Sequence, residues 1–121
     1  MSDTAGPARP YGIRDDRAHG LLLAEEDGRV VGRIVYVTLT EPRPALVPLH
    51  TEVPPAHEGR GIAGALATEL YALAAREDRA VVPLCPYVAR WAERHPELAP
   101  APAAELVRAA LAKVEEDPSA W

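Results

Sequence analysis

Several residue types are scarce in this chain of 121 residues. Phenylalanine is absent, aromatic residues make up only 5% of the sequence, and hydrophobic residues make up 48%, many of them alanine. A core of leucine, valine and alanine buries less area per residue than one with phenylalanine, so we expect modest stability. The length fits one domain and is too short for a (β/α)₈ barrel of about 250 residues.

Cysteine and lysine each occur once, as Cys85 and Lys113. A single cysteine excludes a disulfide within the chain. The net charge is −5, which argues against a nucleic-acid partner, because proteins that bind duplex DNA or RNA usually carry a basic surface.

Long apolar runs are also missing. No run approaches the roughly 20 residues that a membrane-spanning helix needs, so we expect no membrane partner. The first ten residues are polar and contain Gly and Pro, without the apolar stretch of a signal peptide. We therefore expect a soluble, cytoplasmic protein in which residues 1–10 are disordered.

The pattern of the chain predicts an antiparallel meander followed by helices. Residues 21–26 and 29–38 are β-rich runs on either side of an Asp-Gly pair, which is a strong hairpin signal. Residues 45–53 predict a third strand, and Pro48 within it indicates a bulge. These three runs would form the first half of the sheet.

The second half of the chain alternates helical and strand patterns. Residues 62–76 have apolar positions at helical spacing, which predicts a helix. Residues 80–84 predict a short buried strand, and residues 87–94 predict a second helix. A Pro/Ala linker leads to a last helix over 103–116, whose apolar face we expect to contain Leu106, Val107, Ala110, Leu111 and Val114. The predicted fold class is α/β, with a mixed α+β sheet built on an antiparallel meander.

A glycine-rich turn lies between the third strand and the first helix. Residues 59–64 read G-x-G-x-x-G, and such a turn lets the backbone and the helix N-terminus approach a phosphate. A dinucleotide-binding fold would need a carboxylate at the end of the next strand, and a P-loop would need Gly-Lys-Ser/Thr; neither is present. A tight turn without a ligand stays open as an alternative.

Residues 58–63 resemble motif A of the GCN5-related N-acetyltransferases (GNAT superfamily), written Q/R-x-x-G-x-G/A, with Glu58 at the first position. His50-Thr51-Glu52-Val53 precede this motif, and residues 82–88 and His95-Pro96-Glu97 follow it in order. Together these segments are similar to the minimal, YjdJ-like branch of the superfamily. The resemblance implies a GNAT-like domain over 11–100, with residues 101–121 as a C-terminal helical extension beyond the usual family length.

The resemblance also implies a cofactor site for acetyl-CoA or CoA as co-substrate. Pantetheine would bond the backbone of the strand before the loop, at Thr51 and Val53. The pyrophosphate would lie on the amides at the start of the helix, and Arg60 would add positive charge. The residues expected to hold the pyrophosphate are Gly59, Arg60, Gly61, Ile62 and Ala63.

Cys85 is the first catalytic candidate, because the resemblance places it near the thiol of CoA. Pro86 suits the first position of a helix, which would make Cys85 the N-cap, and a helix N-terminus favours a thiolate. A buried apolar cysteine is the alternative.

His50 is the second catalytic candidate, as a general base for the incoming amine, and Glu52 is a third, acting directly or through water. Alternation along the strand puts His50 and Glu52 on one face and Thr51 on the other. A hydrogen-bonded structural histidine is the alternative. Because His19, His57 and His95 have no ligand-like spacing, we expect no metal.

The function that follows is acetyl-CoA-dependent acyl transfer to an amine acceptor, either a small molecule or a protein. The amine would attack the thioester directly, or Cys85 would first take the acetyl group. A non-catalytic acyl-CoA-binding or regulatory module is the alternative, and an interaction domain that uses the last helix is a third. The acidic balance favours a cationic acceptor, and the small size fits a monomer or weak homodimer.

Overall fold

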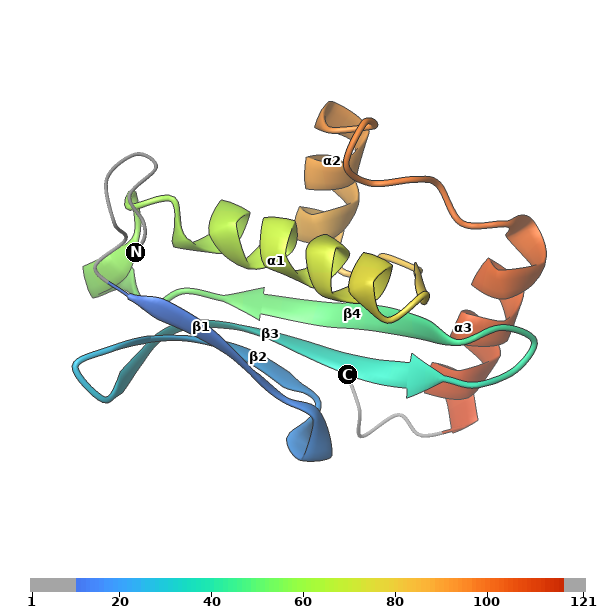
Figure 1. The fold of residues 1–121 in the computed structure, drawn as a ribbon, viewed down its shortest axis with the longest axis horizontal. Coiled ribbons are helices and arrows are strands. Elements are labelled where there is room, and N and C mark those ends of the chain that lie inside the picture. The colour runs from blue at the N-terminus through green and yellow to red at the C-terminus, as the bar shows by residue number, and fades with distance from the viewer. Residues whose placement is uncertain (1–10, 117–121) are drawn as a thin grey trace.

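The computed structural model describes residues 11–116, and the disorder predicted for residues 1–10 lies outside them. Within this part the chain forms one sheet in the order β1-β2-β3-β4-β5 (Figure 1). The first four strands pair antiparallel and β5 pairs parallel with β4. The strands are β1 (Gly12–Asp16), β2 (Leu21–Glu26), β3 (Arg29–Leu39), β4 (Ala45–Glu52) and β5 (Ala80–Val81).

The helices α1 (Ile62–Arg76), α2 (Pro86–Arg94) and α3 (Ala104–Glu116) follow the meander, with two short 3-10 turns, η1 (Arg17–His19) and η2 (Pro55–His57). In the described part of the chain, no helix is both long and apolar enough to cross a membrane. The predicted mixed α/β fold is confirmed, and the order of its elements differs from the prediction by one additional strand, β1, at the start.

Two details of the prediction were wrong. Strand β5 contains only Ala80 and Val81 and is shorter than the strand predicted over 80–84. The amides of Val82 and Leu84 still donate to carbonyls of β4 at 2.9 and 3.2 Å. Pro83 and Pro48 lack amide protons, which interrupts the ladder. Leu111 does not belong to the buried face of α3, since it is 42% exposed.

Strand β1 was not predicted at all. Its sequence, GIRDD, contains one β-branched residue and two aspartates, which are poor strand formers. Pairing with β2 and the ion pair between Arg14 and Glu25 at 2.9 Å hold it at the edge of the sheet. Tertiary contacts thus determine this strand.

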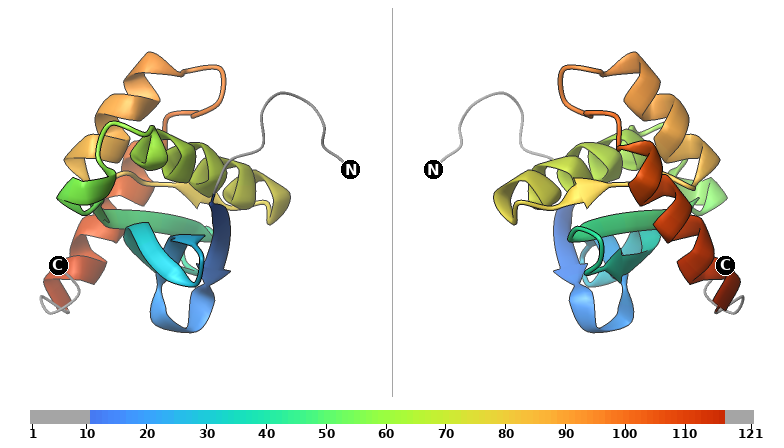
Figure 2. Two further views of the ribbon diagram at one scale, coloured as in Figure 1. Left: turned by 90° about the vertical axis from the view of Figure 1, so that its left-hand side faces the viewer. Right: turned by 90° about the vertical axis from the view of Figure 1, so that its right-hand side faces the viewer.

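The two faces of β4 contribute to two separate cores. Leu46 packs in the first core, with α1 and α2, whereas Val47 and Leu49 pack in the second core, with Leu106 and Val114 of α3. Helices α1 and α3 therefore lie on opposite sides of the sheet (Figure 2). The predicted bulge is present, because Pro48 and His50 pair with adjacent residues of β3 and leave Leu49 as the extra residue.

Gly32 allows α1 to pack closely against strand β3. A Cβ at this position would lie 2.5 Å from Cγ2 of Ile62 and 3.3 Å from Cδ1 of Leu66. Because the Ile62 side chain is branched and stiff, we expect Gly32→Ala to lower the free energy of unfolding by about 1–3 kcal/mol. Gly12→Ala, where nothing lies within 4 Å, is the matched control in urea unfolding. Equal losses in the two variants would contradict this packing argument.

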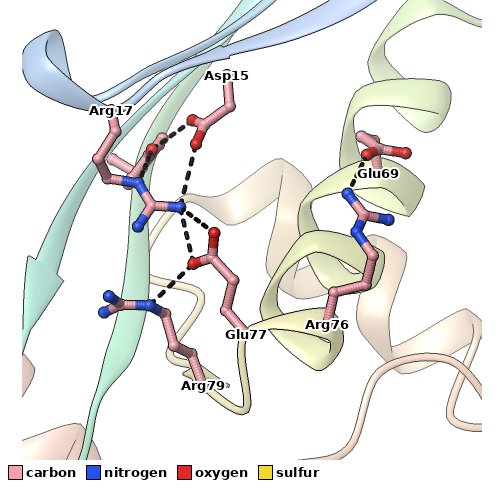
Figure 3. A network of polar contacts seen from close by, with 7 residues as sticks. Asp15, Arg17, Glu69, Arg76, Glu77 and Arg79 are labelled. Atoms are coloured by element: carbon pink, nitrogen blue, oxygen red, sulfur yellow. Dashed lines mark hydrogen bonds and ion pairs between the residues drawn. The ribbon is translucent and has the colours of Figure 1, made fainter.

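A polar network joins β1 and β3 to the end of α1 (Figure 3). Arg17 donates to the Tyr36 hydroxyl at 2.9 Å, to Asp15 at 3.0 Å and to Glu77 at 2.8 Å, and Arg79 donates to Glu77 at 2.9 Å. Tyr36 in turn donates to Asp15. The network connects the edge strand to the helix that carries the glycine turn.

Burial, with the hydrogen bond to Asp15, raises the pKa of Tyr36 to about 12, and burial raises that of Tyr71 to about 12. In the unfolded chain a tyrosine ionises near pH 10, so the raised pKa values stabilise the folded state against unfolding. This contribution to the free energy of unfolding is complete below about pH 10 and is lost as the pH rises to about 12.

We expect Tyr36→Phe to cost about 1 kcal/mol at neutral pH through its lost hydrogen bonds. The same variant should lose less stability than the parent protein between about pH 10 and about pH 12. Denaturant unfolding across this range checks both effects, with Tyr87→Phe as the control. If the free energy of unfolding of Tyr36→Phe fell with pH as steeply as that of the parent protein, the raised pKa of Tyr36 would be refuted.

Candidate functional site

The turn between β4 and α1 has the backbone geometry of an anion-binding loop. Gly59 and Gly61 have φ values of +83° and +78°, which other residues rarely adopt, and Gly61 is the N-cap of α1. Among residues 11–116, no side chain caps this helix, so its first amides can bond a ligand. These amides and the helix dipole together favour a phosphate group.

Arg60 holds this loop to the sheet. Its guanidinium donates to both carboxylate oxygens of Glu26 at 2.8 and 3.2 Å, donates to Nδ1 of His57 at 2.9 Å, and lies over the Tyr11 ring. The hydrogen bond from Arg60 keeps the pKa of Glu26 below its usual range. Arg60 was predicted to add charge at the phosphates, and here much of that charge is offset by Glu26.

Strand β4 and the chain after β5 separate beside α2. The amide of Cys85 donates to the carbonyl of Pro48 at 2.9 Å, and from there β4 continues to Glu52 while the other segment turns into α2. The hydroxyl of Thr51 and the thiol of Cys85 lie 3.3 Å apart, so they meet where the two segments separate.

Cys85 is the N-cap of α2 with Pro86 at the first helical position, as predicted. Its side chain is 3% exposed and belongs to the first core. The thiol therefore combines the burial of a core residue with a helix N-terminus and a hydroxyl partner in Thr51.

The predicted alternation along β4 is confirmed by its register with β3. Thr51 pairs with Ile34, which packs in the first core, so its side chain faces α1 and α2. His50 and Glu52 share the opposite face, where Arg33 Nε donates to Glu52 at 2.6 Å. The Cys85 thiol and the His50 side chain thus lie on different faces of β4.

A family profile described as GCN5-related N-acetyl-transferase matches residues 21–101, which is more than half of the chain. The chain belongs to the GCN5-related N-acetyltransferase superfamily. Its match is to the minimal, YjdJ-like branch of these GNAT proteins, as the motifs predicted.

Among solved structures, the GNAT domain is similar to ribosomal-protein-alanine N-acetyltransferase from Brucella melitensis biovar Abortus 2308, with 30% identity and a TM-score of 0.53. The match covers 69% of this chain and 62% of that protein, so the chain spans less than two thirds of that protein's length. A search of curated proteins gave no significant match.

Sequence reasoning missed two residues that contact the GNAT site. Glu26 holds Arg60, and Arg33 holds Glu52, through ion pairs of 2.8 and 2.6 Å. These partners are far apart in the sequence and meet through strand pairing, so no local motif signals them. Within residues 11–116, no three His, Cys, Asp or Glu side chains group as metal ligands would.

Proposed function

We propose that this GNAT domain transfers an acetyl group from acetyl-CoA to a primary amine. The observation that carries the proposal is the glycine loop, where Gly59 and Gly61 shape an uncapped helix N-terminus beside the separating segments of β4 and α2. The pyrophosphate would accept hydrogen bonds from the amides of residues 59–63. Pantetheine would follow the backbone of Thr51 and Val53 toward Cys85.

Cys85 is the nucleophile in this proposal. Its thiolate attacks the carbonyl carbon of the acetyl thioester, the C–S bond to CoA breaks, and CoA leaves as a thiol after taking up a proton. Two features support Cys85: it is the N-cap of α2, and the Thr51 hydroxyl lies 3.3 Å from its sulfur. The acetyl group is then held on Cys85 as a thioester.

His50 is the base for the second step. The amine enters between β4 and the segment after β5, which separate beyond the hydrogen bond from Cys85 to Pro48, and attacks the acetyl carbon on Cys85. His50 takes the proton that the amine loses, and the thiolate of Cys85 leaves. The carboxylate of Glu52 already accepts a hydrogen bond from Arg33 Nε at 2.6 Å, so we give Glu52 an orienting role instead. An amine reaching β4 from the face of His50 would not compete with CoA for space.

Release of CoA in the presence of candidate amines tests this function. The panel contains polyamines, free amino acids, lysine peptides and, because of the Brucella relative, peptides with N-terminal alanine. CoA release that depends on one class of amine, with acetylated product detected by mass spectrometry, supports transfer. Tight binding of acetyl-CoA without release for any amine would favour the non-catalytic acyl-CoA-binding module.

A further inference from the structure

A cavity of about 340 Å³ lies at the opposite end of α1 from the glycine loop. Tyr71, Ala74 and Ala75 of the second half of α1 form one wall, and Val81 of β5 adjoins them. Ligand sites in proteins commonly have volumes of about 300–1,000 Å³, so this cavity can hold a compact molecule. It is separate from the residues assigned above to acyl transfer.

The opposite wall comes from the segment between α2 and α3. The first turn of α3 also contributes to this wall. Leu98, Pro100 and Ala101 lie within the match to the family profile, whereas Pro102, Ala103, Glu105 and Leu106 follow residue 101, where that match ends. The C-terminal extension therefore completes the cavity. This gives the extension a role beyond covering the second face of the sheet.

Among residues 11–116, the lining is apolar except for the Tyr71 hydroxyl and three charged groups, of which two are cationic and one is acidic. Arg79 bonds Glu77 through Nε, which leaves its terminal N–H groups for another acceptor. Within the part of the chain that the structure describes, Arg43 makes only a long ion pair of 3.6 Å with Asp78, and its side chain is 54% exposed. Because Glu105 is the single carboxylate among the described lining residues, the cavity favours an anion over a cation.

We propose that this cavity binds a small organic acid with an apolar body, such as an arylacetate or a short-chain fatty acid. The apolar body packs against Tyr71, Ala74 and Val81, and the carboxylate accepts hydrogen bonds from Arg43 and Arg79. The same charges disfavour an amine, so this site differs in ligand class from the acceptor site of the transferase.

Trp91 provides a direct signal for binding. The Tyr71 ring lines the cavity and stacks on Trp91, with ring centroids 5.7 Å apart and planes 23° apart. The sequence contains two tryptophans, so a Trp121→Phe background makes Trp91 the only one. Its fluorescence is then followed during titration with phenylacetate, phenylacetamide and phenethylamine, which share a ring but differ in charge.

We expect saturable binding of phenylacetate, at least roughly tenfold weaker binding of the amide, and none of the amine. Arg43→Gln should weaken phenylacetate binding by roughly tenfold. Ala75→Leu should abolish it by filling the cavity, whereas Ala112→Leu, at an exposed alanine of α3, should leave it unchanged. Thermal melts establish that each variant is folded.

Four results would overturn the proposal. The first is no saturable change with phenylacetate up to its solubility limit. The second is equal or tighter binding of phenethylamine, and the third is undiminished binding in a folded Ala75→Leu variant. Phenylacetate binding that disappears in Gly61→Ala would place the ligand at the glycine loop and would equally refute this site.

Discussion

Replacement of Cys85 by alanine is expected to lower acetyl transfer by at least about a thousandfold, as removal of a covalent nucleophile does in other enzymes. Its sulfur lies at the N-cap of α2, 3.3 Å from the Thr51 hydroxyl, where β4 and the segment after β5 separate. The folded state should lose only about 1 kcal/mol, because few buried atoms are removed. Acetyl-CoA affinity should change little, since the amides of the loop are untouched.

Three measurements separate the chemical step from the binding of acetyl-CoA. Steady-state release of CoA gives the rate, calorimetry gives the affinity for acetyl-CoA, and mass spectrometry of the parent protein without amine detects an acetyl group on Cys85. Thr51→Val is the companion variant, because it keeps the shape of the side chain but removes the hydroxyl beside the sulfur. Turnover that stays unchanged in Cys85→Ala would show that the amine attacks acetyl-CoA directly.

Gly61→Ala is expected to weaken acetyl-CoA binding by at least roughly tenfold. An alanine at φ +78° is strained, so the loop would relax and move its amides. A hydrogen bond to a charged group contributes about 1.5–3 kcal/mol, and the loss of one such bond accounts for this effect. Isothermal titration of the folded variant gives the affinity.

Gly28→Ala is the matched control for this prediction. Gly28 has φ of +77°, and neither glycine has a neighbouring atom within 4 Å of its would-be Cβ. Both variants should therefore lose about 1 kcal/mol of stability, while only Gly61→Ala loses affinity for acetyl-CoA. If Gly28→Ala weakened binding as much as Gly61→Ala, the effect would come from stability and not from the loop.

Local patterns in the sequence predict much of this fold. The Asp-Gly hairpin, the bulge after Pro48, the helix that begins at Ile62 and the N-cap at Cys85 all appear as expected. Each depends on the conformational preferences of a few adjacent residues, which a short window of sequence contains.

The remaining features depend on contacts between distant segments. Strand β1 lacks a β-forming pattern and is placed by β2, and the Glu26 carboxylate reaches Arg60 only once the sheet has formed. The cavity beside Tyr71 likewise requires the C-terminal extension to return to the end of α1. The spacing of residues in the sequence contains no information on these long-range contacts.

The central claim is that residues 59–63 hold the pyrophosphate of an acyl-CoA. Isothermal titration of the parent protein with acetyl-CoA tests this claim most directly. CoA and NAD are titrated as controls, because NAD also carries a pyrophosphate but lacks pantetheine. The account predicts binding of acetyl-CoA and CoA, with little or none of NAD. If none of the three ligands bound, the result would contradict the account, and the glycine loop would be a structural turn only.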